Sequence, residues 1–225
     1  MIPQESPTCS STSLRVQEAF AFHGAPHNLP GVENRWEIVS TKSCFKDKNV
    51  EIVEEKVRSP QKPEPRSWTV ARRKRAVVVA AMTEQGGLIL IRQERIPVRA
   101  AIWEVAAGQI DDESEEPDDI AAVALRELRE ETGFELAEGG DLIPLGDYFT
   151  SPGFTDERGY CFLAKPVREC AEGHSREESE SILDCRAFSP AEIRDMIARN
   201  EIRDANTLAV CARLLARGLL SFAKE

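Results

Sequence analysis

Residues 108–134 read GQIDDESEEPDDIAAVALRELREETGF, and the interpretation of the whole chain starts from this stretch. From residue 118 to residue 132 the apolar positions recur at helical spacing, which predicts one amphipathic helix. Gly133 suits the left-handed residue that ends such a helix. The apolar stripe that would anchor the helix consists of Ala121, Ala124, Leu125 and Leu128.

Three carboxylates gather near the end of this predicted helix. Glu127, Glu130 and Glu131 fall at positions i, i+3 and i+4, so they share one helical face. Like charges repel one another, and the helix C-terminus already carries partial negative charge. Arg126 and Arg129 can offset part of it. A solvated acidic face with ordinary Glu–Arg pairs is the simpler interpretation, but the compact pattern favours a hard divalent cation, Mg²⁺ or Mn²⁺.

Composition limits the classes of partner. The chain has 225 residues and a formal net charge of −10, so we expect no nucleic-acid partner, because phosphate backbones bind basic faces. A small phosphate-containing ligand can still bind if metal ions supply positive charge. No apolar run approaches the length of a membrane span, so no membrane association is expected. The six cysteines form no Cys-x-x-Cys pair, which predicts reduced, mostly buried thiols in a cytoplasmic protein.

The rest of the chain is rich in strand patterns. Residues 36–58 alternate polar and apolar positions around 46–49, which predicts a β-hairpin. Residues 59–66, SPQKPEPR, are interpreted as a proline-rich connector, where an interior strand is not expected. Further strands are predicted at 75–82, 88–93, 102–105, 142–149, 159–164 and 183–188.

Two helices are predicted to close the chain. Ser189, Pro190 and Glu192 supply the cap, the first-turn proline and the third-position glutamate of a helix start. A final helix with a Leu/Ala-rich face is expected over 204–222. Strands around a central helix, followed by helices, indicate the α+β class, here an α/β/α sandwich on a mixed sheet preceded by a small N-terminal antiparallel β-sheet.

The carboxylate stretch resembles the signature of a known family. Residues 126–134, RELREETGF, are similar to the second half of the Nudix box, G-x5-E-x7-R-E-U-x-E-E-x-G-U, where U is aliphatic or aromatic. Gly108 resembles the opening glycine, but the distance from Gly108 to Arg126 is four residues longer than in the pattern. The early glutamate of the box therefore stays unassigned among Glu113, Glu115, Glu116 and Asp118.

The resemblance implies a fold, a chemistry and a set of roles. It implies the Nudix fold and metal-dependent hydrolysis of a phosphoanhydride bond, with Mg²⁺ as the cofactor or Mn²⁺ in its place. Glu127 and Glu131 would be the principal metal ligands, and the main-chain carbonyl of Ala107 another. Glu130 would assist in catalysis, and Arg126 would position a carboxylate through a salt bridge.

Five flanking segments resemble the ADP-ribose pyrophosphatase branch of this family. They are RQERI at 92–96, WEVAAG at 103–108, SPGF at 151–154, EESESI at 177–182 and IRDANT at 202–207. This branch implies a nucleotide-sugar substrate, ADP-ribose, which is hydrolysed to AMP and ribose 5-phosphate. It also implies that Glu178 acts as general base and Glu180 as a further metal ligand, although which of the two is the base stays open.

Candidate substrate contacts lie outside the box. The forked donors of Arg95 suit a phosphate or a terminal ribose, although an ordinary surface arginine is an equal alternative. Trp36 or Trp68 could stack on the adenine, or simply pack between strands. Pro152 and Gly153 form a turn that would border the substrate.

The resemblance also divides the chain and predicts a dimer. We expect a tail or arm at 1–33, a hairpin and dimerisation segment at 34–66, and the Nudix hydrolase domain at 67–225. In the ADP-ribose pyrophosphatase branch the N-terminal sheet is exchanged across a homodimer and completes the adenine pocket of the partner.

Three other functions stay open as alternatives. The substrate could be GDP-mannose or UDP-glucose. A non-catalytic Nudix-fold nucleotide sensor is disfavoured because Glu127, Glu130 and Glu131 are all present. An mRNA-cap or RNA-end hydrolase is disfavoured by the net charge of −10.

Overall fold

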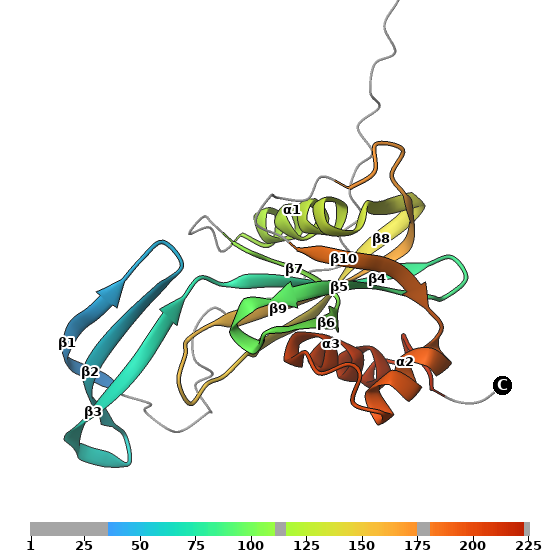
Figure 1. Ribbon diagram of the computed structural model, residues 1–225. Helices are drawn as coiled ribbons and strands as arrows, with labels where there is room; N and C mark the ends of the chain where they lie inside the picture. The colour runs from blue at the N-terminus through green and yellow to red at the C-terminus, as the bar shows by residue number, and fades with distance from the viewer. Residues whose placement is uncertain (1–35, 111–115, 175–180, 223–225) are drawn as a thin grey trace, which may run out of the picture.

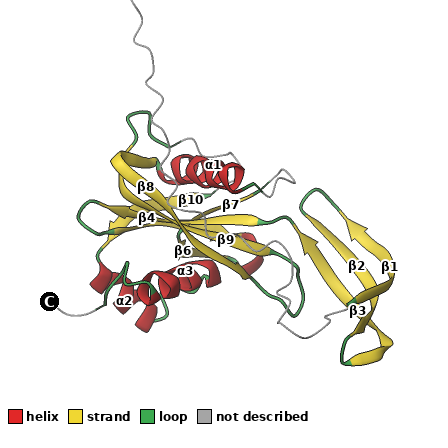
Figure 2. Cartoon of the chain, turned by 180° about the vertical axis from the view of Figure 1, so that it is seen from behind, coloured by secondary structure: helices red, strands yellow, loops and turns green. Residues whose placement is uncertain are grey.

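The computed structural model (Figure 1) describes residues 36–110, 116–174 and 181–222. Its main body is a seven-stranded mixed sheet with helix α1 on one face and helices α2 and α3 on the other, as two opposite views show (Figures 1 and 2). The helices are α1 (Pro117–Glu127), α2 (Pro190–Ala198) and α3 (Ala205–Ala216). The strands are β4 (Ala76–Thr83), β5 (Leu88–Arg95), β6 (Ala100–Glu104), β7 (Ala106–Gln109), β8 (Phe134–Phe149), β9 (Arg158–Glu169) and β10 (Ile182–Phe188). The predicted α/β/α sandwich is confirmed.

The order of the strands explains why the sheet is mixed. The main path is β10-β5-β4-β9-β8, with β6 paired to β5 and β7 paired to β4. Strands β4 and β9 run parallel, whereas the other paired strands of this sheet run antiparallel. This arrangement puts β4 at the centre of the main body.

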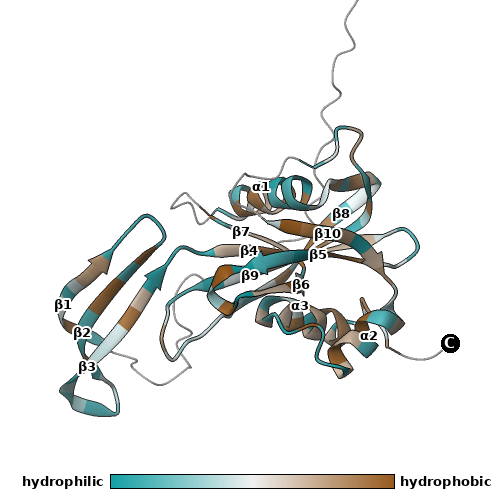
Figure 3. Ribbon diagram, viewed as in Figure 1, coloured by the Kyte–Doolittle hydropathy of each residue, from teal (hydrophilic) through white to brown (hydrophobic). Residues whose placement is uncertain are grey.

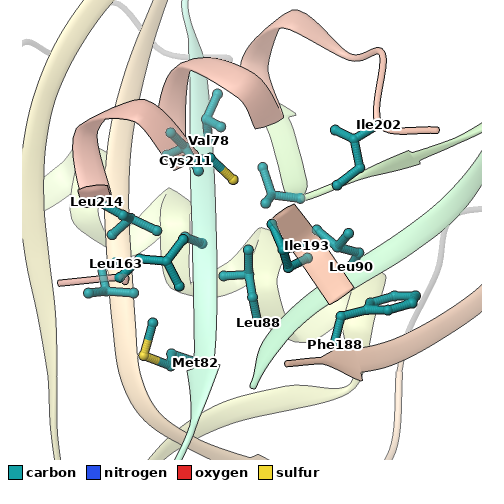
Figure 4. Close-up of a cluster of buried hydrophobic side chains, with 14 of the residues drawn as sticks. Val78, Met82, Leu88, Leu90, Leu163, Phe188, Ile193, Ile202, Cys211 and Leu214 are labelled. Atoms are coloured by element: carbon teal, nitrogen blue, oxygen red, sulfur yellow. The ribbon is translucent and has the colours of Figure 1, made fainter. Parts of the chain in front are cut away.

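The central strand β4 is buried on both faces. Val77 and Val79 pack in the hydrophobic cluster under α1, whereas Val78 and Ala80 pack in the cluster under α2 and α3. Because both faces are covered, the strand is apolar throughout rather than alternating. Figure 4 shows Val78, Leu163, Ile193 and Leu214 in the cluster formed by the sheet, α2 and α3.

A second, three-stranded antiparallel sheet precedes the main one. It contains β1 (Glu37–Lys46), β2 (Val50–Ser59) and β3 (Lys62–Arg73) in that order. The sheet stands beside the main body and carries hydrophobic as well as hydrophilic residues (Figure 3). The main chain of Ala71 joins it to the loop after β8, because its N–H donates to the carbonyl of Phe154 at 2.9 Å.

The predicted hairpin at 36–58 is confirmed, but the connector predicted at 59–66 is wrong. Strand β3 begins at Lys62, and only the two residues before it form the turn. Both prolines of this part of β3 fall where the register with β2 shifts, between the pairs Ser59↔Lys62 and Val57↔Arg66. Proline is tolerated there because β3 is an edge strand of its sheet and the ladder is interrupted at the irregularity.

The predicted central helix forms in two parts. Helix α1 is followed by a π-helical turn, η2 (Leu128–Thr132), and Gly133 closes it in the left-handed conformation at φ 75°. The helix start at Ser189 is also confirmed, with the reciprocal bonds of a capping box to Glu192.

The final helix is shorter than predicted. Helix α3 ends at Ala216 instead of continuing to residue 222. Gly218 adopts a left-handed φ of 65°, and the N–H groups of Leu219 and Leu220 both turn back to the carbonyl of Leu214. The apolar pattern continues past the helix because Leu220 is buried in the core although it is no longer helical.

The structure bears on two further predictions from composition. None of the helices in the described part of the chain is long and apolar enough to cross a membrane. All five described cysteines are free, but only Cys161 and Cys211 are buried, whereas Cys44 is exposed and the other two are intermediate. The expectation of mostly buried thiols is therefore too broad, and a cytoplasmic location stays a prediction.

Candidate functional site

The end of the α1–η2 helix brings two of the predicted acids into the protein interior. Glu127 is 6% exposed and Glu131 is 2% exposed, whereas the side chain of Glu130 remains 29% exposed. The π-helical turn contains Glu130 and Glu131, and such turns are frequent at functional sites. The three acids that share a face in the sequence pattern therefore divide into two buried acids and one at the surface.

Glu131 is held by the main chain of β7. The N–H of Ala107 donates to Oε2 of Glu131 at 2.9 Å. The N–H and C=O groups of one residue in an antiparallel strand point to the same edge. The carbonyl of Ala107, a predicted ligand, thus lies on the edge of β7 that faces Glu131.

Gly108 makes room for the second buried acid. A β-carbon at position 108 would lie 2.0 Å from the carboxyl carbon of Glu127. A side chain at position 108 would displace this carboxylate, so glycine is required for the close approach of Glu127 to β7. Gly108 and Glu127, a predicted metal ligand, are therefore in direct contact.

Arg126 bridges two acids on the same helix. Its Nη2 lies 2.7 Å from Oε1 of Glu127, and its Nη1 lies 2.8 Å from Oε2 of Glu130. These contacts are those that a positioning role requires, and the role itself stays a prediction.

Arg95 is paired with a residue to which the sequence interpretation assigned no role. Its guanidinium contacts both carboxylate oxygens of Glu104, with Nε–Oε1 at 2.9 Å and Nη2–Oε2 at 2.5 Å. Burial raises the pKa of Glu104, while the hydrogen bond from Arg95 opposes that rise. The hydrogen bond to Glu104 in turn raises the pKa of Arg95, and the nearby charge of Glu131 acts in the same direction. The WEVAAG segment contained Glu104, but only the register of β5 and β6 shows its partner.

The donor set at the end of the helix fits a hard divalent cation. Two buried carboxylates face a strand that also offers a main-chain carbonyl, and all three are oxygen donors of the kind that Mg²⁺ and Mn²⁺ prefer. Among the described residues, no three Asp, Glu, His or Cys side chains converge on one point. A cation here would therefore complete its coordination with the main-chain oxygen and water, as Mg²⁺ commonly does.

The predicted aromatic contacts lie in another place. Trp36, Trp68 and Pro152 line one pocket of about 560 Å³ on the three-stranded sheet. Both tryptophans are more than half exposed, and Gly153 faces open space. Figures 1 and 2 show this sheet beside the main body, away from α1. Within one chain the structure thus gathers the predicted residues into two separate groups.

Several candidates lie outside the described residues. Glu178 and Glu180 fall in 175–180, and Glu113 and Glu115 fall in 111–115. The whole of the predicted arm at 1–33 falls in 1–35. Nothing is described of the side chain of Asp118 either.

Comparison with known proteins agrees with the fold. The sequence model of the NUDIX domain matches residues 72–211. The ADP-ribose pyrophosphatase of Bacillus subtilis (strain 168) is 33% identical over 132 residues, which cover 59% of this chain and 67% of that protein. The ADP-ribose pyrophosphatase of Mycobacterium tuberculosis is 32% identical over 139 residues, 62% of this chain and 63% of that protein. A crystal structure of an ADP compounds hydrolase shares the fold at a TM-score of 0.66 and 18% identity, covering 82% of this chain and 94% of that one.

The chain belongs to the Nudix family, because the sequence model of the domain matches residues 72–211. The mixed sheet between helices and the buried acids at the end of α1 agree with this class of protein. Within that family it is a hydrolase of the ADP-ribose pyrophosphatase type. Nudix hydrolases generally use divalent metal ions, in agreement with the oxygen donors found here.

We predict that Gly108→Ala preserves the fold but displaces Glu127. The atoms that a methyl group would meet are the end of a side chain rather than backbone, so the unfolding free energy should fall by only about 1–3 kcal/mol. Titration calorimetry should show at least about a tenfold loss of Mn²⁺ affinity, because the carboxylate can no longer lie against β7. Gly153→Ala is the matched control, since a β-carbon there meets nothing within 4 Å. Unchanged Mn²⁺ affinity in Gly108→Ala would contradict the placement of the metal site.

Proposed function

We propose that this protein hydrolyses the pyrophosphate bond of ADP-ribose, giving AMP and ribose 5-phosphate, with Mg²⁺ as the activating ion. The observation that carries the proposal is the burial of Glu127 and Glu131 against the main chain of β7. Two relatives at 33% and 32% identity are ADP-ribose pyrophosphatases, which supports this choice of nucleotide sugar.

The chemistry requires charge compensation on both phosphates. A water oxygen attacks one phosphorus, the bridging P–O bond breaks, and the leaving phosphate departs with the electron pair of that bond. Glu127, Glu131 and the carbonyl of Ala107 would hold the cation, which neutralises phosphate oxygens and lowers the pKa of bound water. Arg126 keeps two of the carboxylates in place through its paired contacts.

We assign the removal of the proton from the attacking water to the acidic loop, with Glu178 as general base and Glu180 as a further ligand. The described segments before and after 175–180 support this assignment, because each is hydrogen-bonded to a residue close to the candidate site. Before the loop, the N–H of Cys170 donates to the carbonyl of Gly133 at 2.7 Å. After it, Ser181 Oγ donates to Oε2 of Glu94, the residue next to Arg95.

We further propose that the protein acts as a homodimer in which each aromatic pocket serves the site of the other copy. Trp36, Ile38 and Trp68 are all more than half exposed on the three-stranded sheet, and such a surface usually marks an interface or a binding site. In a single chain the lining of this pocket does not include the buried acids, and Figure 1 shows the three-stranded sheet beside the main body. A second copy would cover the exposed apolar surface and bring an adenine-stacking pocket to the acids.

We predict that the metal-site acids are required for turnover and that ADP-ribose is the preferred substrate. In a panel of ADP-ribose, GDP-mannose and UDP-glucose with Mg²⁺, kcat/KM should be highest for ADP-ribose, and EDTA should abolish turnover reversibly.

Glu127→Gln and Glu131→Gln should each lower kcat/KM by at least about a hundredfold, because a buried cation ligand is lost. Glu135→Gln is the control, since Glu135 pairs with Arg168 at 2.9 Å on β8 and β9. Intact turnover in both site variants would show that the metal assignment is wrong.

We predict that two variants in the acidic loop separate the base from the ligand. Glu178→Gln should lower kcat at least about tenfold with little change in the Mg²⁺ concentration needed for half-maximal activity, because general-base catalysis is lost. Glu180→Gln should raise that Mg²⁺ concentration instead. Glu177→Gln, in the same run of charges, is the control for a general loss of negative charge. A loss smaller than tenfold in Glu178→Gln would remove Glu178 as the base.

We predict that two inactive variants restore activity to each other when mixed. Glu127→Gln removes one metal-binding acid from one copy, and Trp68→Ala removes the stacking residue of the other. After denaturation and refolding together, about half of the dimers are mixed and each has one intact site, so on the order of a quarter of wild-type activity should return. Trp68→Ala mixed with a Glu127→Gln/Trp68→Ala double variant should not recover. A monomeric mass in sedimentation, or no recovery in the mixture, would contradict the shared site.

A further inference from the structure

Glu104 is a buried carboxylate with no place in the reaction described so far. It ends β6, it is only 3% exposed, and it lies opposite Ile91 in the register with β5. A charged group is seldom buried to this extent without a specific partner. The partner is Arg95, whose own side chain remains 40% exposed.

We propose that Glu104 is a positioning residue that holds the guanidinium of Arg95 in the orientation in which it binds the substrate. The inference rests on the proposed function, because it assigns a role within the same site. It also gives a role to an acid that is neither a metal ligand nor a base.

The contacts fix the plane of the guanidinium. Nε of Arg95 lies 2.9 Å and 3.1 Å from the two carboxylate oxygens of Glu104, and Nη2 lies 2.5 Å from one of them. Arginine has five N–H donors in a rigid fork, and these contacts use one edge of it. Within the described part of the chain no hydrogen bond uses Nη1, at the other edge of the fork, and the side chain is 40% exposed. Glu104 stands three residues before Ala107, whose N–H donates to Glu131 at 2.9 Å, so the pair lies near the proposed metal ligands.

The main chain next to Glu104 is held by the start of α3. The N–H of its neighbour Val105 donates to Oγ1 of Thr207 at 3.0 Å, and Thr207 is fully buried. Thr207 in turn donates from its N–H and its hydroxyl to Asp204, each at 2.7 Å. The start of α3 therefore fixes the main chain from which Glu104 extends. A carboxylate on such a fixed support can orient a long, flexible side chain such as that of Arg95.

Positioning and plain electrostatics predict opposite effects for the loss of this carboxylate. If Glu104 acted only through its charge, its removal would leave Arg95 more attractive to an anionic substrate, and binding would become tighter. If Glu104 acts by orienting Arg95, its removal frees the guanidinium and binding becomes weaker. The sign of the change therefore distinguishes the two explanations.

The test is Glu104→Gln, which keeps the size of the side chain and one oxygen acceptor. We expect KM for ADP-ribose to rise about tenfold with kcat within about twofold of wild type, since one set of charge-assisted hydrogen bonds is misplaced. In an Arg95→Lys background the same change should alter KM less than about twofold, because lysine cannot make the forked contact. Glu135→Gln, which breaks another glutamate–arginine pair, should leave KM unchanged.

A second measurement separates this inference from the proposed function. Calorimetry in EDTA gives the Kd of uncleaved ADP-ribose, so it does not depend on turnover. Absence of wild-type turnover with Mg²⁺ would remove the proposed function, whereas weaker binding to Glu104→Gln than to wild type would still support the positioning role. A Kd or KM that is unchanged or lower in Glu104→Gln, or an equal effect in the Arg95→Lys background, would overturn it.

Discussion

The carboxylate of Glu127 occupies the space that a side chain at position 108 would need, and the rest of the site depends on this contact. It allows the end of α1 to lie directly on β7, and the same approach lets Glu131 accept a hydrogen bond from the main chain of Ala107. Two acids from one helical turn can then stay buried at a strand edge that also presents a carbonyl. With a side chain at position 108, the carboxylate of Glu127 would have to turn away from β7 and the oxygen donors would no longer face one another.

The main sheet stabilises the close packing of α1 on β7. Strand β4 pairs with β7 on one side of the contact and is covered on both faces by hydrophobic clusters. Leu128, fully buried beside Glu127, anchors the helix to one of these clusters. Burying two carboxylates is costly, and the apolar burial around them has to offset that cost. The core therefore fixes the helix from which the acids extend, while Arg126 and the N–H of Ala107 hold the carboxylates themselves.

The sequence predicted those parts of the structure that depend on local pattern. The carboxylate helix, Gly133 at its end and the cap at Ser189 follow from spacing and residue type within one turn. The errors arose where contacts with distant parts of the chain determine the local structure. Prolines in 59–66 disfavoured a strand, but an edge position beside a register shift accommodates them. The apolar pattern after Ala216 favoured more helix, but Leu220 reaches the core through a turn at Gly218.

Pairings across the sheet were beyond sequence reasoning for the same cause. Glu104 and Arg95 stand nine positions apart, and only the register of β5 with β6 shows that they meet. Arg126 pairs with Glu127 and Glu130 within one turn of its own helix, a contact of the kind that the resemblance implied. The charge of each of these arginines is thus largely balanced by its carboxylate partners. What each arginine offers is N–H donors in a fixed direction rather than net positive charge. In a protein with a net charge of −10, the charge of a pyrophosphate is then best neutralised by bound cations, and the arginines serve to orient what the cations attract.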